Sequence, residues 1–293
     1  MMAEKNIQIL DQQGMLQNYA KAVLGMLPLP GAKAEGLPDR TLRIADVKID
    51  ANNLAEYVKV CRLRLRDTLP ITYPFVLSFP AVMNLLVSKD FPLPAMGMVH
   101  MSNKIEQIRP ISVSETLTID VHAENMREHR SGLLVDLVTE ITIEGELVWR
   151  QFSTFLRKQR TSLSDEPRPE KVDDSPGSAG ELPTTTLKVT GKQIAKYADV
   201  SGDHNPIHVS KIGAKAFGFP TVIAHGMWTC AAALGILEGR LPDATTYTVD
   251  FGKPVLLPAK VAVFTRKTDS GWELALRHPK KEHAHLTAKI EAR

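Results

Sequence analysis

The stretch SGDHNPIH, residues 201–208, decides how the rest of this chain is interpreted. It places a carboxylate, Asp203, and an imidazole, His208, five positions apart, which is not a spacing that aligns side chains on one helix face. Pro206 has no backbone N–H and restricts Asn205 to extended conformations. We therefore expect residues 201–208 to form an extended loop of fixed shape.

A small and apolar run begins sixteen residues after His208. It opens with Ala224-His225-Gly226 and continues without a charge from Met227 to Leu237. This run is too short to cross a bilayer. We expect a buried core helix.

Seven positions within residues 197–208 resemble the signature of the MaoC-like, R-specific enoyl-CoA hydratases: Tyr197, Ser201-Gly202-Asp203, Asn205-Pro206 and His208. Residues 223–227 and 251–255 extend the resemblance. It implies a hot-dog fold, in which an antiparallel sheet wraps a long central helix, with the Asp and His on a loop facing the helix N-terminus. The family often has a serine eight residues beyond the glycine of its His-Gly pair, where this sequence has Leu234.

Hydration of an enoyl thioester requires groups that handle the proton of water and the proton of the α-carbon. Asp203 and His208 on one loop can hold a water between them and act as general base and acid. Charge on the thioester oxygen requires a hydrogen-bond donor, and the backbone N–H of Gly226 at a helix N-terminus supplies one. We therefore expect Asp203, His208 and Gly226 to be catalytic.

Three further residues are expected to support the site. Asn205 should brace the loop by bonding backbone groups, Ser201 belongs to the same motif, and His225 should pack or hydrogen-bond beside the oxyanion site. Taken alone, Asp203 would be interpreted as a turn or N-cap residue and His208 as a structural imidazole. Their joint occurrence with Asn205-Pro206 favours catalysis.

Metal sites and cofactors are not indicated. A calcium loop would need a glycine where His204 stands and a glutamate where Ser210 stands. The spacing of His204 and His208 imitates a zinc motif, but Pro206 interrupts the helix that such a motif needs. The histidines within residues 278–285 are expected on a solvated hairpin.

Composition describes an ordinary globular chain. Its 293 residues are 43% hydrophobic and 24% charged, which fits two domains of roughly 100–200 residues each. The net charge of +3 is too small to indicate nucleic acid, although a mildly basic surface suits a phosphorylated carrier such as coenzyme A. Cys61 and Cys230 indicate no disulfide framework, and no apolar signal core follows Met1, so we expect a cytoplasmic protein without a membrane segment.

Hydrophobic periodicity and turn residues predict the secondary structure. We expect helices at 12–27, 52–61, 81–87, 191–200, 211–217 and 227–237, and strands at 44–49, 98–108, 116–125, 133–155 (divided near 144–146), 245–251, 259–268, 271–277 and 284–292. Ser78 should cap the third of these helices, and Thr190 with Gln193 should form a capping box. A hairpin is expected at 130–132.

A segment rich in proline, glycine, serine and charge separates two similar halves. The predicted division is an N-terminal extension at 1–40, an N-terminal hot-dog unit at 41–158, a linker at 159–183 and a C-terminal hot-dog unit at 184–293. Arg109-Pro110-Ile111 corresponds to Lys253-Pro254-Val255. Pro110 follows Pro80 by thirty residues, and Pro254 follows His225 by twenty-nine. Only the second half carries the catalytic motif.

The resulting prediction is an α+β protein with a double hot-dog fold. Its expected reaction is reversible hydration of trans-2-enoyl-CoA to (R)-3-hydroxyacyl-CoA, without metal or redox cofactor. Alternatives are a (3R)-hydroxyacyl-ACP dehydratase of fatty-acid or polyketide synthesis, an acyl-CoA thioesterase, and a non-catalytic acyl-binding subunit. We expect an acyl-CoA or acyl-ACP substrate, no nucleic acid, and a homodimer or pseudo-dimeric monomer.

Overall fold

One curved sheet forms the framework of the protein. The computed structural model describes residues 6–10, 36–167, 173–281 and 283–293. The N-terminal half contributes β1 (Ile7–Ile9), β2 (Thr41–Val47), β3 (Met98–Gln107), β4 (Leu117–His129), β5 (Gly132–Ile143) and β6 (Glu146–Lys158). The C-terminal half contributes β7 (Thr185–Val189), β8 (Thr245–Phe251), β9 (Ala259–Lys267), β10 (Gly271–Arg277) and β11 (Ala284–Ala292).

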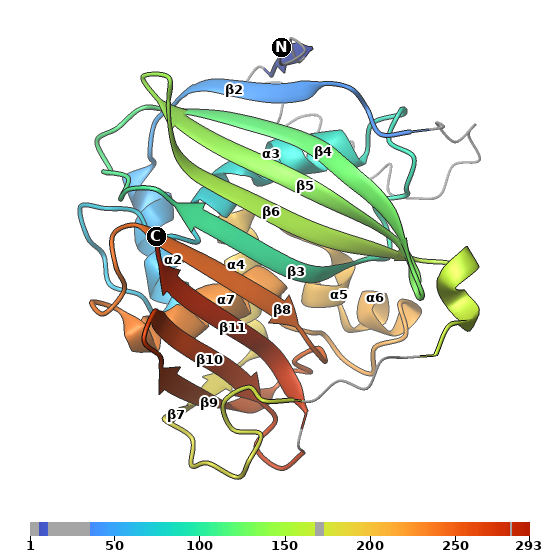
Figure 1. Ribbon diagram of the computed structural model, residues 1–293, viewed down its shortest axis with the longest axis vertical. Helices are drawn as coiled ribbons and strands as arrows, with labels where there is room; N and C mark the ends of the chain where they lie inside the picture. Colours follow the sequence, from blue (N-terminus) through green and yellow to red (C-terminus); the bar gives the residue numbers. More distant parts are fainter. Residues whose placement is uncertain (1–5, 11–35, 168–172, 282) are drawn as a thin grey trace.

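The strand order shows two halves of the same design. Across the described sheet it is β1-β2-β4-β5-β6-β3-β8-β11-β10-β9-β7 (Figure 1). Apart from β1, which adds to β2 at one edge, the orders β2-β4-β5-β6-β3 and β7-β9-β10-β11-β8 repeat one pattern. The halves join through antiparallel pairing of β3 with β8, from Ser102 opposite Asp250 to Gln107 opposite Thr245. This confirms the predicted double hot-dog fold.

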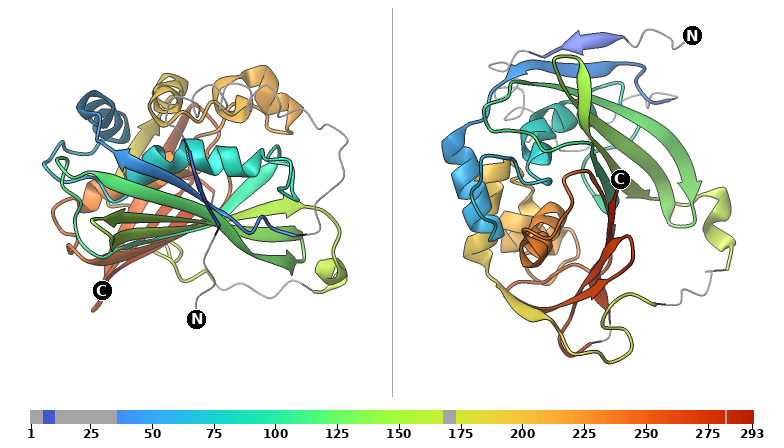
Figure 2. Two further views of the ribbon diagram at one scale, coloured as in Figure 1. Left: turned by 90° about the horizontal axis from the view of Figure 1, so that it is seen from above. Right: turned by 60° about the vertical axis from the view of Figure 1, so that its left-hand side comes forward.

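Helices cover one side of the sheet (Figure 2). They are α2 (Ala51–Cys61), α3 (Pro74–Leu86), α4 (Gly191–Ser201), α5 (Pro206–Val209), α6 (Lys211–Ala216) and α7 (Gly226–Leu234), which is followed by the 3-10 turn η2 (Gly235–Leu237). The 3-10 turn η1 (Ser162–Asp165) lies apart from these helices (Figure 1, Figure 2). The expected helix at 12–27 lies outside the described residues. The predicted strands and the hairpin at 130–132 are confirmed to within a few residues.

Side-chain caps fix the starts of α2 and α4. The Asp50 carboxylate accepts the N–H of Asn52, and the Thr190 hydroxyl accepts the N–H of Gln193. The predicted capping box is only half formed, because the Gln193 amide instead donates to the Val60 carbonyl at 3.0 Å. Trp228 Nε1 donates to that same carbonyl at 3.0 Å. These bonds hold α4 and α7 against the end of α2.

The start of α3 differs from the prediction. The helix begins at Pro74, which suits a first helical position because its missing N–H has no partner to lose there. Ser78 is therefore an interior residue whose hydroxyl donates to the Phe75 carbonyl, and Pro80 also lies inside the helix. The residue that precedes α3 is Tyr73, so Tyr73 rather than Pro80 corresponds to His225 in the repeat.

The predicted linker holds more structure than its composition indicates. Arg277, which is buried, donates to the Pro176 carbonyl at 2.8 Å and to the Asp173 carboxylate at 2.7 Å. It also donates to the Ser175 hydroxyl. An arginine with five donors can organise a turn that has no apolar core of its own. The domain boundaries placed from the sequence remain predictions.

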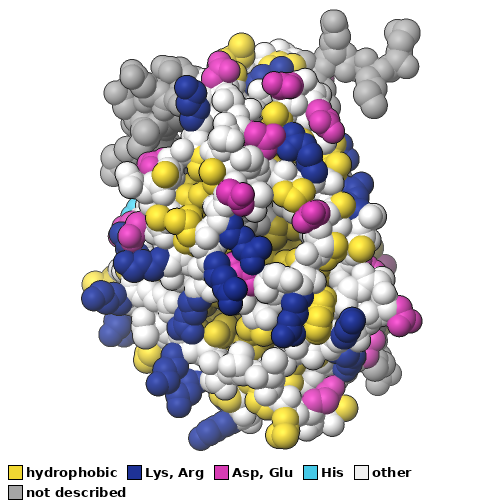
Figure 3. Space-filling model, turned by 90° about the vertical axis from the view of Figure 1, so that its left-hand side faces the viewer, with side chains coloured by type: hydrophobic (Ala, Val, Ile, Leu, Met, Phe, Trp, Pro, Cys, Tyr) yellow, Lys and Arg dark blue, Asp and Glu magenta, His cyan; other side chains and the backbone are white. Residues whose placement is uncertain are grey.

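On the side of the molecule where α2 lies, basic and acidic side chains are spread among hydrophobic ones (Figure 3). No helix among the described residues is both long and apolar enough to span a membrane. A cavity lies elsewhere, lined by residues of α3, α5, β3 and β8.

Candidate active site

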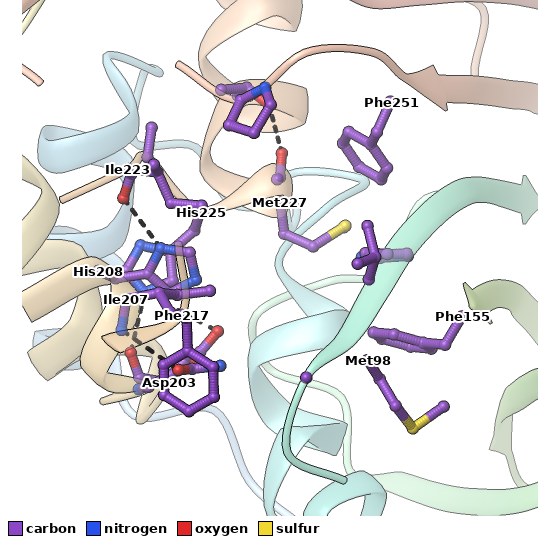
Figure 4. Close-up of a pocket in the computed structure, with 18 of the residues that line it drawn as sticks. Met98, Phe155, Asp203, Ile207, His208, Phe217, Ile223, His225, Met227 and Phe251 are labelled. Atoms are coloured by element: carbon purple, nitrogen blue, oxygen red, sulfur yellow. Dashed lines mark hydrogen bonds and ion pairs between the residues drawn. The ribbon is translucent and has the colours of Figure 1, made fainter. Parts of the chain in front are cut away.

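A cavity of about 380 Å³ collects the predicted site residues (Figure 4). Asp203, Asn205, His208, His225 and Gly226 all line it. The N-terminal half supplies apolar wall residues from α3, β3 and β6, among them Phe79, Met98 and Phe155. Two half-sheets thus enclose one site whose polar groups come mainly from the C-terminal half.

The loop that carries the motif is shorter than predicted, because it ends in a helix. Asn205 has an extended backbone and its side-chain oxygen accepts the N–H of Ile207 at 3.3 Å, which makes it the N-cap of α5. Pro206 is the first residue of that helix, a position that proline favours. His208 therefore projects from a helical turn whose start is capped by the Asn205 side chain.

His208 is held in one tautomer. Its Nδ1 lies 2.9 Å from the Ile223 carbonyl, and because a carbonyl only accepts, Nδ1 carries the proton. Burial lowers the pKa of His208, against opposing contributions from the Asp203 charge and the bond to Ile223. The imidazole is therefore neutral near pH 7, with the Nε2 lone pair left to accept a proton.

The Asp203 carboxylate lies within reach of both imidazoles. One oxygen accepts the N–H of Asn205 at 3.2 Å, and the side chain keeps 23% of its surface exposed. Ligand atoms of Asp203, His208 and His225 all lie within 4.8 Å of one another. Two hydrogen bonds of about 2.8 Å, meeting at a bent angle, span that separation, so one water can bridge carboxylate and imidazole.

His225 contacts both Asp203 and His208. Its ring stacks on His208 with centroids 3.7 Å apart, and its Nε2 donates to the Asp203 backbone carbonyl at 2.9 Å. Burial, with a smaller effect of His208, lowers the pKa of His225 to about 3. A neutral ring can stack on His208 without charge repulsion and fixes the backbone that presents the carboxylate.

Ser201 and Gly226 lie at the ends of α4 and α7. The Ser201 hydroxyl donates to the Tyr197 carbonyl at 2.8 Å and accepts the N–H of Asp203 at 3.3 Å, which couples α4 to the motif. Gly226 is the first residue of α7, where backbone N–H groups lack intrahelical acceptors. A Cβ at Gly226 would lie 3.0 Å from the Phe251 ring, so a side chain there would displace Phe251, which also lines the cavity.

The carboxylate and two imidazoles also have the composition of a three-ligand metal site, which the sequence did not indicate. The ring stacking disfavours that use. Nitrogen lone pairs lie in the ring planes, whereas the two rings face each other with centroids 3.7 Å apart and an interplanar angle of 28°, so a metal between the stacked faces would lie out of both ring planes. The expected absence of a metal stays a prediction.

Two histidines of the cavity wall were missed from the sequence. His100 of β3 lies between Phe155 and Phe251, at centroid distances of 4.4 and 4.7 Å, and burial lowers its pKa to about 3. His285 was expected on a solvated hairpin, but it is buried and its Nδ1 donates to the Lys253 carbonyl at 2.7 Å. The pairing register of β3 shifts between His100 and Ser102, next to the cavity. The sequence gives no signal for a bulge at this position, so His100 could not be predicted as a cavity residue.

Comparisons with known proteins identify relatives of this chain. The sequence profile of the MaoC like domain matches residues 174–284. The 3-hydroxyacyl-thioester dehydratase X of Mycobacterium tuberculosis is 47% identical over 283 residues, covering 96% of this chain and 99% of that protein.

Solved structures extend the similarity to the fold. The crystal structure of HtdX from Mycobacterium tuberculosis superposes with a TM-score of 0.77 at 49% identity, over 86% of this chain and 99% of that one. A MaoC-like dehydratase from Phytophthora capsici shares the fold, with a TM-score of 0.69 at 16% identity over 90% of this chain and 98% of that one. Because a 3-hydroxyacyl-thioester dehydratase is 47% identical over nearly the full length of both chains, this chain belongs to the MaoC-like dehydratase family.

Proposed function

We propose that the protein catalyses reversible hydration of a trans-2-enoyl thioester to the (R)-3-hydroxyacyl thioester, a hydro-lyase reaction. The observation that carries the proposal is the approach of Asp203 and His208 to within 4.8 Å in a cavity that also contains the start of α7. The similarity to a 3-hydroxyacyl-thioester dehydratase supports the same reaction class.

In the hydration direction, Asp203 and His208 hold the water. As its oxygen bonds to C3, the pair accepts one proton from the water and returns one proton to C2, so its own protonation state is restored. Negative charge that develops on the thioester oxygen is met by the Gly226 N–H and the positive end of α7. Because His208 is neutral and Asp203 is partly exposed, both can accept hydrogen bonds from the water at the start.

The apolar wall from the N-terminal half is suited to an acyl chain. Phe79, Val82 and Met83 of α3 and Met98 of β3 face the same cavity as the catalytic pair. Burial of apolar chain contributes roughly 0.8 kcal/mol per methylene. We propose that the half without a catalytic motif binds the acyl group while the other half carries the chemistry.

The carrier is proposed to be coenzyme A, with acyl carrier protein as the alternative. Relatives named for CoA and for a thioester in general both occur among similar proteins. Turnover of the same acyl group on the two carriers, compared at equal concentration, distinguishes them. Higher kcat/KM on the carrier protein would favour the dehydratase of fatty-acid or polyketide synthesis.

The test of the reaction is incubation with crotonyl-CoA and with a longer enoyl-CoA, followed by chiral analysis of the product. We expect (R)-3-hydroxyacyl-CoA from wild type and a loss of about 10²- to 10⁴-fold in kcat for Asp203→Asn. Release of free thiol without hydroxyacyl product would select a thioesterase. Unchanged function of the Asp203→Asn protein would select a non-catalytic acyl-binding role.

We also propose that the chain acts as a pseudo-dimeric monomer or a homodimer in the cytoplasm. Pairing of β3 with β8 supplies within one chain the junction of two hot-dog units. Cys61 and Cys230 are both free and buried, which suits a reducing compartment. Sedimentation of the purified protein measures the oligomeric state.

A further inference from the structure

The internal repeat places one tyrosine at the same position in each half. Tyr57 is the seventh residue of α2, and Tyr197 is the seventh residue of α4. Each ring lies 5.0 Å from the residue that precedes the next long helix of its half, Tyr73 before α3 and His225 before α7. The half without the catalytic motif thus provides an internal reference for the half that has it.

The two tyrosines differ in their hydrogen bonds. The Tyr57 hydroxyl donates to the Thr72 hydroxyl at 2.8 Å, and Thr72 comes directly before Tyr73. The residue directly before His225 is Ala224, which has no hydroxyl. The Tyr197 hydroxyl is buried and has no hydrogen-bond partner within the part of the chain that the structure describes.

Side chains near the unpartnered Tyr197 hydroxyl are part of the cavity wall. Tyr197 and Ala224 both line the cavity together with Asp203 and His208, whereas Tyr57 and Thr72 do not. A buried hydroxyl without a partner destabilises a protein. In the catalytic half, no hydroxyl of the described residues occupies the position equivalent to the Thr72 hydroxyl oxygen, so an oxygen atom of a bound molecule that reached this position would satisfy the Tyr197 hydroxyl.

We propose that Tyr197 is a further catalytic residue, whose hydroxyl donates to the reacting oxygen: the water in hydration, or the 3-hydroxyl of the substrate in dehydration. This inference rests on the proposed function. That oxygen takes the place which the Thr72 hydroxyl occupies in the other half.

The hydrogen-bond capacity of water fits this assignment. A water has two protons and two lone pairs, and Asp203 and His208 Nε2 accept its protons. The Tyr197 hydroxyl then occupies one lone pair, and the other is directed at C3. In dehydration, the same hydroxyl donates to the leaving oxygen as its bond to C3 breaks and a proton arrives from the Asp203–His208 pair.

Tyr197 serves as a donor and not as an acid. Burial raises the pKa of Tyr197, and the Asp203 charge acts in the same direction, so the phenol keeps its proton at working pH. The side chain is 1% exposed and its ring is held beside His225. A fixed donor of this kind needs no reorganisation when charge develops on the oxygen.

The test compares Tyr197→Phe with Tyr57→Phe. We expect Tyr197→Phe to lower kcat on crotonyl-CoA about 10- to 100-fold with KM within about twofold, and to leave Tm unchanged or raised, because it removes an unpaired hydroxyl. Tyr57→Phe removes a paired hydroxyl, so it should lower Tm by about 2–4 °C and keep wild-type kcat. Wild-type kcat in Tyr197→Phe would overturn the proposal.

A second variant restores the partner that the catalytic half lacks. Ala224→Ser places a hydroxyl beside Tyr197, so we expect a raised Tm and a fall in kcat of about tenfold or more. Unchanged kcat in Ala224→Ser with a raised Tm would show that Tyr197 is not needed for turnover and would overturn the proposal. If wild type itself hydrates no enoyl-CoA, the proposed function fails; if wild type is active and both variants match it, only this inference fails.

Discussion

Acidification should destabilise the protein through histidines that are buried in the neutral form. Burial lowers the pKa of His100 and of His225 to about 3, against about 6.5 for an unfolded imidazole. Between those values the unfolded chain binds more protons than the folded one. The free energy of unfolding must therefore fall as pH drops below about 6.5.

The size of the effect follows from the two pKa values. Each imidazole contributes about 1.4 kcal/mol for each pH unit below 6.5, which is about 2 kcal/mol at pH 5. His100 and His225 together give about 4 kcal/mol between pH 7.5 and pH 5. His208, His283 and His285 act in the same direction, because burial lowers the pKa of each.

Urea denaturation at pH 7.5 and pH 5 measures this difference. His100→Phe should reduce it by about 2 kcal/mol, because a phenyl ring between Phe155 and Phe251 does not titrate. Phe155→Leu is the matched control: it disturbs the same stack, so it should destabilise at both pH values and keep the difference. Equal stability of wild type at the two pH values, or an unchanged difference in His100→Phe, would refute the reasoning.

Three further predictions concern the site and the linker. His208→Gln should lower kcat about 10²- to 10⁴-fold, since an amide cannot relay the proton; steady-state hydration of crotonyl-CoA measures it, and a loss under tenfold would contradict the role. Gly226→Ala should lower kcat/KM about tenfold or more, because the added Cβ would lie 3.0 Å from the Phe251 ring and crowd the position of the thioester oxygen. A double variant that also carries Phe251→Leu should recover part of this loss. An unrecovered kcat/KM in the double variant would count against this contact. Arg277→Met should reduce the free energy of unfolding by about 2–3 kcal/mol, since the charged hydrogen bonds to Pro176 and Asp173 are lost. The variant should also expose residues 159–183 to limited proteolysis. An unchanged midpoint of urea unfolding would contradict the contribution of Arg277 to stability.

Much of the fold was predictable because its signals are local. Alternating apolar residues marked every described strand except the two edge strands β1 and β7, and the cap at Thr190 marked the start of α4. The start of α3 was misplaced because Ser78 and Pro80 imitate a helix beginning inside a helix. The helix starts earlier, at Pro74, because most of its residues before Ser78 are buried against the rest of the protein, and this burial cannot be seen from the local sequence.

The site was predictable to the extent that its residues lie in one motif. Residues 201–208 indicated the acid and base pair, and the short helix α5 was missed because Pro206 can start a helix as well as interrupt one. His100 comes from the other half of the chain, and pairing of β3 with β8 brings it to the cavity. Strand pairing over such sequence distances has no local signature, and the unpaired Tyr197 hydroxyl is visible only beside its paired counterpart Tyr57.

The most direct test of the account is a crystal structure of the Asp203→Asn protein with bound (R)-3-hydroxybutyryl-CoA. The account predicts the 3-hydroxyl within about 3 Å of residue 203 and of His208 Nε2, and the thioester oxygen within about 3 Å of the Gly226 N–H. A ligand whose thioester oxygen lies away from the start of α7, or whose hydroxyl is turned away from His208, would contradict it.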